Sequence, residues 1–246
     1  MVRFATIEDA KLAVAAWGGA ASSLIHLGDR GNSVFSFMNA HGKLQILRLT
    51  DPYFRSLTEV NAEIEFINRI FMAGVSVAKA LPALSDEYTI LIKCGVGNLI
   101  CSSIAFAPGV EVLEGSPYWN SEFFCEWWRN LALIHHASQN FRFDAETPAF
   151  DFGNCCYHWF IADIAISLST VRRKVNRDQI KQEFLSGYKK VRLLPPNLDA
   201  LLDLFIRLRV VYVYLSRLHL WSHDRTLKQA QELELIKFRV HDKQGW

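Results

Sequence analysis

The chain has 246 residues, of which 50% are hydrophobic and 21% are charged, so it is long enough to bury the core of one or two globular domains. Its formal net charge is only +2, and its Lys and Arg residues are spread along the chain. We therefore expect no nucleic acid partner. The most apolar region, residues 198–221, contains several charged side chains, so we also expect no membrane partner. The N-terminal residues lack the apolar core of an export signal, which predicts a cytoplasmic protein.

The cysteine pattern argues against a disulfide framework and against a structural zinc site. The count is odd, and no two cysteines have the Cys-x-x-Cys spacing of a metal knuckle. Free cysteines usually behave as small buried hydrophobes, and we expect that of all five. They are Cys94, Cys101, Cys125, Cys155 and Cys156.

The chain begins with a short predicted helix, residues 7–17, which Gly18 and Gly19 end. Three segments rich in branched and aromatic residues follow, and turn-forming residues separate them, at 28–32 and 39–42. This pattern predicts a three-strand antiparallel meander. The strands are expected at residues 22–27, 33–38 and 43–49.

A helix is predicted next, over residues 58–72, because apolar residues recur at helical spacing until Gly74. Two further strands are expected, at residues 88–96 and 98–107, before the Pro108-Gly109 pair. Residues 20–107 should thus form an antiparallel sheet with the 58–72 helix packed on it.

The remainder of the chain is helical in pattern, and the join to it lies near residues 106–115. We therefore predict an α+β fold with a β-rich part, residues 1–108, and a helical part, residues 109–246. Helices are expected at residues 121–138, 157–171, 177–191 and 198–221.

Asp151 is the most informative single residue, because Asp-Phe-Gly follows the short run "PAF". An aspartate at a strand end can offer its carboxylate to Mg²⁺ that bridges nucleotide phosphates. A capping or turn aspartate is the simpler alternative. Asp163 lies within an apolar helical stripe, where a charge must find hydrogen-bond donors.

The order of these elements resembles the two-lobe, protein-kinase-like fold of the aminoglycoside phosphotransferase family, which also contains homoserine-kinase-like and choline-kinase-like members. The first lobe carries the resemblance in "LGDRGNSVFSF", "LQILRLTD", "NAEIEFI" and "IAFAPG". The second lobe carries it in "WWRNLALIHHAS" and "FDFGNCCYHWFIADIA". The resemblance implies an N-lobe of antiparallel sheet plus one helix, a helical C-lobe, and a kinase that uses ATP and Mg²⁺ on a small-molecule acceptor.

The resemblance also implies a set of nucleotide-binding residues. Backbone N–H groups around Gly28, Gly31 and Asn32 would approach the phosphates, although a plain hairpin turn explains the same residues. Arg48 on the third strand would contact the phosphates as a permanent cation, unless it is an outward-facing strand arginine. Glu63 would hold Arg48 in place, with Glu59 and Glu65 as alternatives.

In the same family pattern, Asp151 would bind the metal in a cleft between the lobes, and Asp163 would anchor the backbone of the catalytic loop. That loop reads His-x-Asp-x-x-x-x-Asn, and its aspartate orients the acceptor hydroxyl. The sequence has no such loop, because no aspartate is followed five residues later by asparagine and no histidine is followed two residues later by aspartate. We therefore assign no catalytic residue.

Only residues 136–150 separate His135 from Asp151, where the family has several helical segments and the loop. Either several tens of residues are deleted after this helix, or the loop is shortened and Asn140 survives from it. Either change shortens the C-lobe and would expose apolar surface on its remaining helices.

Three functional hypotheses follow. The chain is a small-molecule phosphotransferase with impaired catalysis, a pseudokinase-like nucleotide-binding or regulatory module, or an inactive truncated gene product. The acceptor cannot be read from the sequence, because helical-lobe residues choose it in this family.

Overall fold

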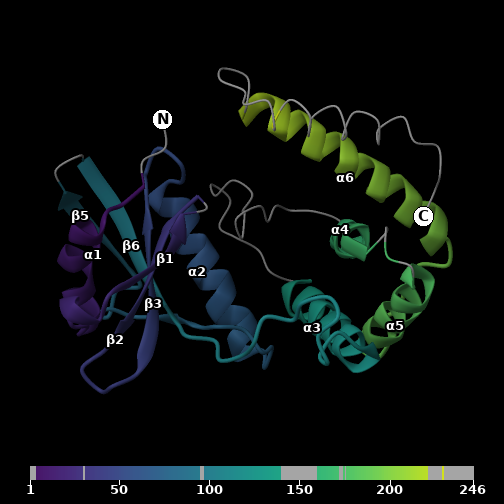
Figure 1. Ribbon diagram of the computed structural model, residues 1–246, viewed down its shortest axis with the longest axis horizontal. Helices are drawn as coiled ribbons and strands as arrows, with labels where there is room; N and C mark the ends of the chain where they lie inside the picture. Colours follow the sequence, from purple (N-terminus) through teal and green to yellow (C-terminus); the bar gives the residue numbers. More distant parts are fainter. Residues whose placement is uncertain are drawn as a thin grey trace. The chain divides into compact units, whose positions relative to one another are not determined.

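The computed structural model in Figure 1 describes residues 4–29, 31–94, 97–139, 160–171, 174, 176–220 and 229 of the chain. The chain divides into two compact units. The first unit comprises Met1–Val112 with His136–Tyr157, and the second comprises Leu113–His135 with His158–Trp246. Each unit is described by itself.

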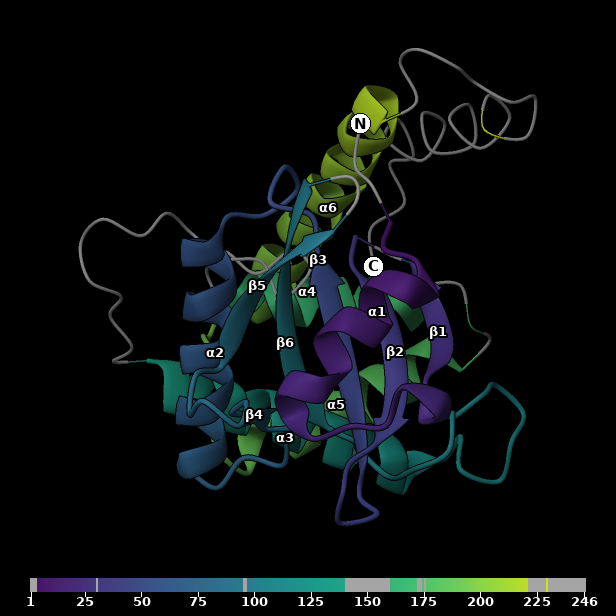
Figure 2. The same cartoon turned by 90° about the vertical axis from the view of Figure 1, so that its left-hand side faces the viewer.

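A six-stranded antiparallel sheet forms the centre of the first unit (Figure 2). Its strands lie in the order β1-β2-β3-β6-β4, and β5 also pairs with β6. The strands are β1 Ile25–Asp29, β2 Ser33–Met38, β3 Leu44–Thr50, β4 Ala80–Leu81, β5 Thr89–Cys94 and β6 Gly97–Ala105. The long β6 therefore binds β3 along one edge and both β4 and β5 along the other.

Helices cover both faces of this sheet because side chains alternate between the faces along each strand. Phe35, Phe37, Leu47 and Leu49 pack in one cluster with residues of α1, Ile7–Val14, and of the 3₁₀ turn η1, Ala15–Trp17. On the other face, Ile100 and Ile104 pack with Val60 and Ile64 of α2, Leu57–Met72. Alternation therefore places Arg48, between Leu47 and Leu49, on the α2 face.

Side-chain hydrogen bonds fix the start of α2 and its place on the sheet. Ser56 and Glu59 form a capping box at its N-terminus. Further along, the side-chain oxygen of Asn68 accepts a 3.1 Å hydrogen bond from the backbone N–H of Ala80. The hydroxyl of Thr89 donates to Asn61 at 2.7 Å. These contacts join α2 to β4 and β5.

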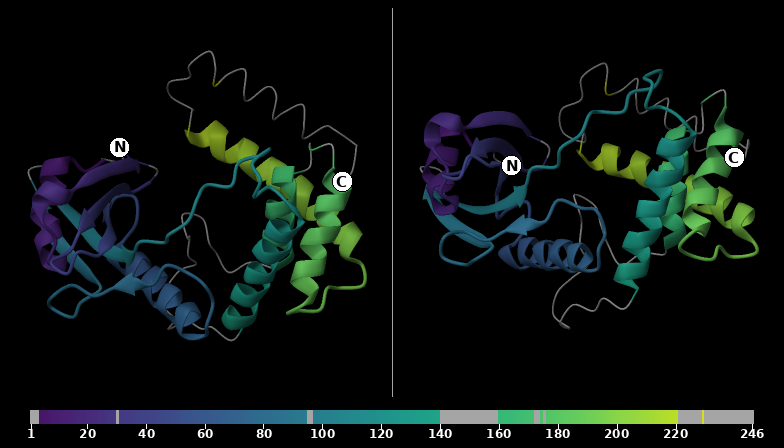
Figure 3. Two further views of the ribbon diagram at one scale, coloured as in Figure 1. Left: turned by 60° about the horizontal axis from the view of Figure 1, so that its bottom comes forward. Right: turned by 90° about the horizontal axis from the view of Figure 1, so that it is seen from below.

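The second unit is helical in its described residues. Its helices are α3 Ser121–Ser138, α4 Phe160–Val171, α5 Arg177–Lys189 and α6 Leu198–Leu220. The indole of Trp128 on α3 stacks on Phe184 of α5, with ring centroids 4.8 Å apart. A Cβ at Gly187 would lie 2.0 Å from the carbonyl oxygen of Cys125, so glycine allows α3 and α5 to lie side by side (Figure 3).

The predicted α+β fold class is confirmed, but some element bounds were wrong. Residues 22–24 were expected in a strand, yet Ala21–Ser23 form the 3₁₀ turn η2. Gly28 was expected in a turn, yet it pairs with Val34 inside β1, after an irregularity in the register. β4 was not predicted at all. No helix in the described part of the chain is long and apolar enough to span a membrane.

The cysteines are free where the structure describes them. Cys94 and Cys101 are buried as expected, and burial raises the pKa of the Cys101 thiol to about 12. Cys125 is only half-buried, which corrects the expectation for that residue. Cys155 and Cys156 lie outside the described residues.

Candidate functional site

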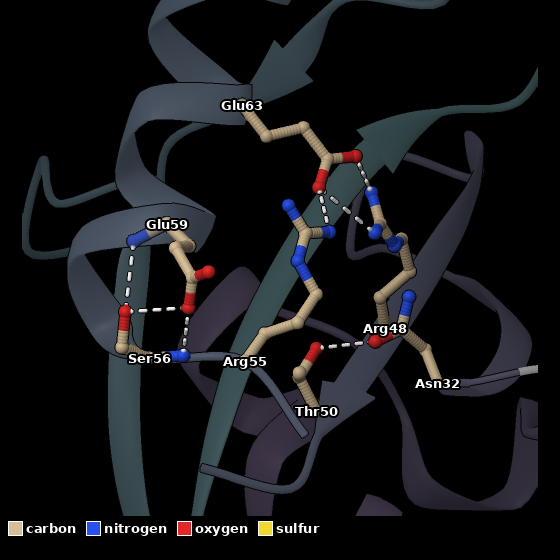
Figure 4. A network of polar contacts seen from close by, with 7 residues as sticks. All are labelled: Asn32, Arg48, Thr50, Arg55, Ser56, Glu59 and Glu63. Atoms are coloured by element: carbon tan, nitrogen blue, oxygen red, sulfur yellow. Dashed lines mark hydrogen bonds and ion pairs between the residues drawn. The ribbon is translucent and has the colours of Figure 1, made fainter. Parts of the chain in front are cut away.

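The predicted pair between Arg48 and Glu63 is present in the first unit (Figure 4). Arg48 Nη1 donates to Glu63 Oε1 at 2.7 Å, and Nη2 donates to Oε2 at 3.3 Å. The Glu63 side chain is 4% exposed and that of Arg48 is 13% exposed. The helical spacing of α2 turns Glu63 toward the sheet, while strand alternation turns Arg48 toward α2, so the two meet.

A second arginine shares the same carboxylate. Arg55 lies in the connection between β3 and α2, and its Nη1 donates to Glu63 Oε2 (Figure 4). The Arg55 side chain is 6% exposed, so the pair is almost fully buried. Glu63 Oε1 therefore accepts a short hydrogen bond from Arg48, and Oε2 accepts a short one from Arg55. The longer Arg48 contact is also to Oε2.

Burial and ion pairing act on the Glu63 carboxylate in opposite directions. Burial alone would raise its pKa, because a low dielectric disfavours the charged form. The hydrogen bonds and positive charges of Arg48 and Arg55 outweigh that effect, and the pKa is lowered from its ordinary value of 4.5. Glu63 is therefore an anion at neutral pH.

The two alternative partners for Arg48 have other surroundings. Glu59 accepts hydrogen bonds from the backbone N–H and the hydroxyl of Ser56, both at 2.7 Å, and caps α2. The hydroxyl contact, the backbone contact and the Arg55 charge lower its pKa against the opposing effect of burial. Glu65 is exposed. The choice of Glu63 as the partner of Arg48 was therefore correct.

The turn between β1 and β2 brings its candidate residues close to the end of β3. Asn32 Oδ1 accepts a 2.7 Å hydrogen bond from the Thr50 hydroxyl, so this side chain ties the turn to β3. Gly31 has φ +81°, and a Cβ there would lie 2.8 Å from Phe54 Cε1. A Cβ at Gly28 would meet no atom of the described residues within 4 Å, so these residues leave the space over that backbone open.

The predicted metal ligand, Asp151, lies outside the described residues, as does Asn140. Within the described ranges, no group of three or more His, Cys, Asp or Glu side chains could hold a metal ion. The assignment of Asp151 as a metal ligand therefore stays a prediction from the sequence.

Asp163 lies in the first turn of α4 and contacts a histidine of α3. His135 Nε2 is 3.1 Å from Asp163 Oδ2, and the Tyr188 hydroxyl is 2.8 Å from His135 Nδ1. A carboxylate oxygen only accepts, so Nε2 donates to Asp163, and in the neutral ring Nδ1 then accepts from the Tyr188 hydroxyl. The His135 ring also stacks on Phe160, with centroids 4.4 Å apart. The Asp163 side chain is 48% exposed, so its charge is not buried, which corrects the expectation from the apolar helical pattern.

Sequence reasoning missed Arg55 as a partner of Glu63, and it missed the contacts of His135. Arg55 stands in a connection without periodicity, so no pattern says where it points. His135 gave a weak signal, because it falls on the buried face of α3 with Phe124, Trp128 and Ala132. A polar residue on such a face needs a hydrogen-bond partner.

Comparison with known proteins finds kinases of small molecules. No protein-family model matches the chain. Amicoumacin kinase of Bacillus subtilis (strain 168) is 22% identical over 302 residues, covering 92% of this chain and 89% of that protein. A solved amicoumacin kinase in complex with AMP-PNP, Ca²⁺ and Ami has a TM-score of 0.82 at 20% identity, covering 96% of this chain and 93% of that one.

A microcompartment-associated aminopropanol kinase has a TM-score of 0.75 at 16% identity, covering 94% of each chain. The structural matches show that the fold is shared, and the curated relative adds similarity in sequence along most of the chain. The chain is thus similar in sequence to an amicoumacin kinase and shares its fold with two small-molecule kinases, in agreement with the resemblance to small-molecule kinases read from the motifs.

Proposed function

We propose that this chain binds ATP with a divalent cation through its first unit, and that it is a small-molecule phosphotransferase whose phosphoryl transfer is impaired. The observation that carries the proposal is the buried pair between Arg48 on β3 and Glu63 on α2. In protein kinases, a cation on the third strand contacts the nucleotide phosphates, and a glutamate of the following helix holds that cation. The present pair joins the same two elements in the same way.

The residues around the pair fit a polyphosphate. Arg48 is a permanent cation with five N–H donors. Two of its nitrogens, Nη1 and Nη2, donate to Glu63. The open backbone at Gly28 leaves room for a phosphate oxygen near the N–H groups of the turn. In the proposal, Arg48 and the backbone of Gly28, Gly31 and Asn32 hold the phosphates. Residues 1–108 are the nucleotide-binding part and residues 109–246 the acceptor-binding part.

A divalent cation would neutralise phosphate charge at this site when bound. Asp151 is proposed as its protein ligand, on the strength of the Asp-Phe-Gly motif. The solved amicoumacin kinase carries Ca²⁺ together with the nucleotide analogue AMP-PNP, which supports nucleotide and divalent-ion binding here. We propose Mg²⁺ as the ion, because ATP is commonly used as its Mg²⁺ complex.

Impaired transfer is proposed because the catalytic loop is missing from the sequence. The alignment with the Bacillus subtilis kinase extends over 302 residues, more than the 246 residues of the whole chain. Several tens of aligned positions therefore have no counterpart here, which agrees with the deletion read after His135. Both named relatives are kinases, so they give no support to a purely regulatory, pseudokinase-like module.

We propose a small alcohol as the acceptor class, because kinases of this type transfer phosphate to hydroxyl groups. The two named relatives act on amicoumacin and on aminopropanol. Aminopropanol, an alcohol that also bears an amine, is therefore a suitable first probe.

Isothermal titration of the full chain with Mg·ATP tests the proposal without knowledge of the acceptor. Arg48→Ala should weaken ATP binding by roughly tenfold to hundredfold, because a hydrogen bond to a charged group contributes about 1.5–3 kcal/mol. Glu63 keeps Arg55 as a partner in this variant, so the fold should persist. Arg129→Ala, which removes an exposed pair on α3, is the matched control and should bind as wild type. A folded wild-type chain that takes up no Mg·ATP would refute the proposal.

A further inference from the structure

Arg55 is a buried cation that neither the fold nor the kinase pattern accounts for. Its side chain is 6% exposed, and its charge partner Glu63 is already engaged by Arg48. Arg55 Nη2 is buried and finds no hydrogen-bond partner among the residues that the structure describes. Burying a guanidinium with an unpaired N–H group is costly, and an apolar side chain of similar size would avoid that cost. Stability alone therefore does not explain an arginine at this position.

The backbone of Arg55 is held firmly. Its N–H donates to the carbonyl of Asp51 at 3.1 Å, and the Asp51 carboxylate accepts from the N–H of Tyr53 at 3.0 Å. Directly after Arg55, Ser56 begins the capping box of α2. The guanidinium is therefore presented to Glu63 from a fixed turn rather than from a loose loop.

The same turn also contacts the hairpin that carries the candidate phosphate-binding backbone. Phe54, the residue before Arg55, lies against Gly31, where even a methyl group would come within 2.8 Å of its ring. The β3–α2 connection, residues 51–56, thus contacts the β1–β2 turn with one residue and the Arg48–Glu63 pair with the next. It joins both parts of the proposed phosphate site.

The division of the Glu63 oxygens shows what Arg55 does to Arg48. Arg55 engages Oε2, while Arg48 has one short bond, 2.7 Å to Oε1, and one long bond, 3.3 Å to Oε2. Without Arg55, both Glu63 oxygens would be available to accept short hydrogen bonds from Arg48, in the symmetric two-bond geometry that arginine–carboxylate pairs prefer. Arg48 would then be held more tightly by Glu63 and have weaker donors left for another anion.

We infer that Arg55 is a positioning residue for the nucleotide phosphates. By engaging Glu63 Oε2, it limits Arg48 to one short hydrogen bond with Glu63 and leaves the other Arg48 donors directed at the ligand. The ligand class is a nucleoside polyphosphate, so the inference rests on the proposed function. The role of Arg55 is exerted through Glu63, not through contact with the ligand.

A double-mutant cycle between Arg55→Gln and Glu63→Gln tests this inference, with the affinity for Mg·ATP measured by titration calorimetry on the full chain. Arg55→Gln alone should weaken Mg·ATP binding by roughly tenfold, the effect of one charge-assisted contact. Arg55→Lys should recover part of that loss, because it keeps the charge. In the Glu63→Gln background, Arg55→Gln should cause no further loss, since the carboxylate through which it acts is gone.

Thr6→Ala is the control for simple destabilisation, because it removes the capping box of α1, in the same unit but on the opposite face of the sheet. It should lower the unfolding midpoint and leave the Mg·ATP affinity unchanged. If Arg55→Gln does the same, its role is structural and the inference is wrong. If Glu63→Gln does not fold, the contrast between Arg55→Gln and Arg55→Lys decides: equal affinities would overturn the inference, and partial recovery with Lys would support it. A folded wild-type chain that does not bind Mg·ATP would refute the proposed function and the inference together.

Discussion

At the scale of single residues, the stability of the first unit and the proposed phosphate site both depend on Glu63. Its carboxylate lies between two buried guanidinium groups. Glu63→Gln would leave both cations without a charged partner, and removing one partner of a buried pair costs about 3–5 kcal/mol. We expect a loss of that size in the free energy of unfolding, measured by urea denaturation at pH 7.

Glu65→Gln is the matched control, because it makes the same chemical change two residues later on the exposed side of α2. It should change the unfolding free energy by no more than about 0.5 kcal/mol. Equal, small losses in the two variants would mean that Arg48 and Arg55 do not depend on the Glu63 charge.

The lowered pKa of Glu63 predicts how this stabilisation depends on pH. Because the pKa in the folded chain lies below the ordinary value of 4.5, the contribution is fully present above that value. It is lost as the pH falls from there through the folded-state pKa, where the carboxylate becomes protonated. The difference in unfolding free energy between wild type and Glu63→Gln should therefore be constant near neutral pH and shrink below pH 4.5. A difference that grows on acidification would contradict the prediction.

The sequence allowed the Arg48–Glu63 pair to be predicted, but not its third member. Strand alternation and helical spacing each state which way a side chain points, and the kinase pattern joins the two elements. Arg55 follows neither period, and its direction is set by the turn that begins at Asp51, which depends on hydrogen bonds that no sequence pattern encodes. Asp151 and the metal site stay predictions.

At the scale of elements, the β1–β2 hairpin depends on the contact between Gly31 and Phe54. Gly31→Ala should destabilise the chain for two reasons: φ is +81°, which costs an L residue about 1–2 kcal/mol, and the new methyl group meets the Phe54 ring. Gly42→Ala in the β2–β3 turn is the matched control, since φ there is +68° but no atom lies within 4 Å. Thermal unfolding should show a larger loss for Gly31→Ala.

Phe54→Ala combined with Gly31→Ala separates the two causes. If the ring is the obstacle, the extra loss at Gly31 should disappear in the double variant, and only the backbone cost that Gly42→Ala also carries should remain. If the single variants Gly31→Ala and Gly42→Ala lose equal thermal stability, the Phe54 ring moves aside at little cost.

Elements with one buried face were predicted well, and those without one were not. β2 and β3 have buried residues at alternating positions or in runs, and the expected bounds match within a residue. β1 is mostly exposed, with an irregularity between His26 and Gly28, so hydrophobic pattern could not place its end. β4 has two residues, too few to show a hydrophobic periodicity in the sequence.

At the scale of the whole molecule, the proposed shortening after His135 bears on the apolar surface of the second unit. Among its described residues, α6 exposes a row of apolar side chains three or four positions apart: Leu204, Leu208, Val211, Tyr212 and Leu215. These lie on one side of a helix, as residues that pack against a neighbour do. An exposed apolar row is consistent with the proposed loss of a covering segment.

Turnover of the whole chain should be limited by the absent family loop. The acceptor-orienting aspartate of the family loop contributes on the order of 10²–10⁴-fold to the rate of such a reaction, and the loop also positions the acceptor. We therefore expect ADP formation with Mg·ATP and aminopropanol to stay near background, even if ATP binds. Asp151→Ala should weaken the Mg²⁺-dependent part of ATP binding without changing that rate, whereas Arg48→Ala should weaken binding itself.

Inserting a family segment with an intact His-x-Asp-x-x-x-x-Asn loop between His135 and Asp151 distinguishes a missing loop from a defective nucleotide site. If the first unit is competent, the graft should raise the rate of ADP formation by roughly 10²–10⁴-fold, and the same graft with its loop aspartate changed to Ala should not. Robust, Asp151-dependent phosphorylation by the ungrafted chain would contradict the prediction. It would mean that another carboxylate orients the acceptor, and Asp144 and Glu146 are the nearest candidates in sequence to Asp151.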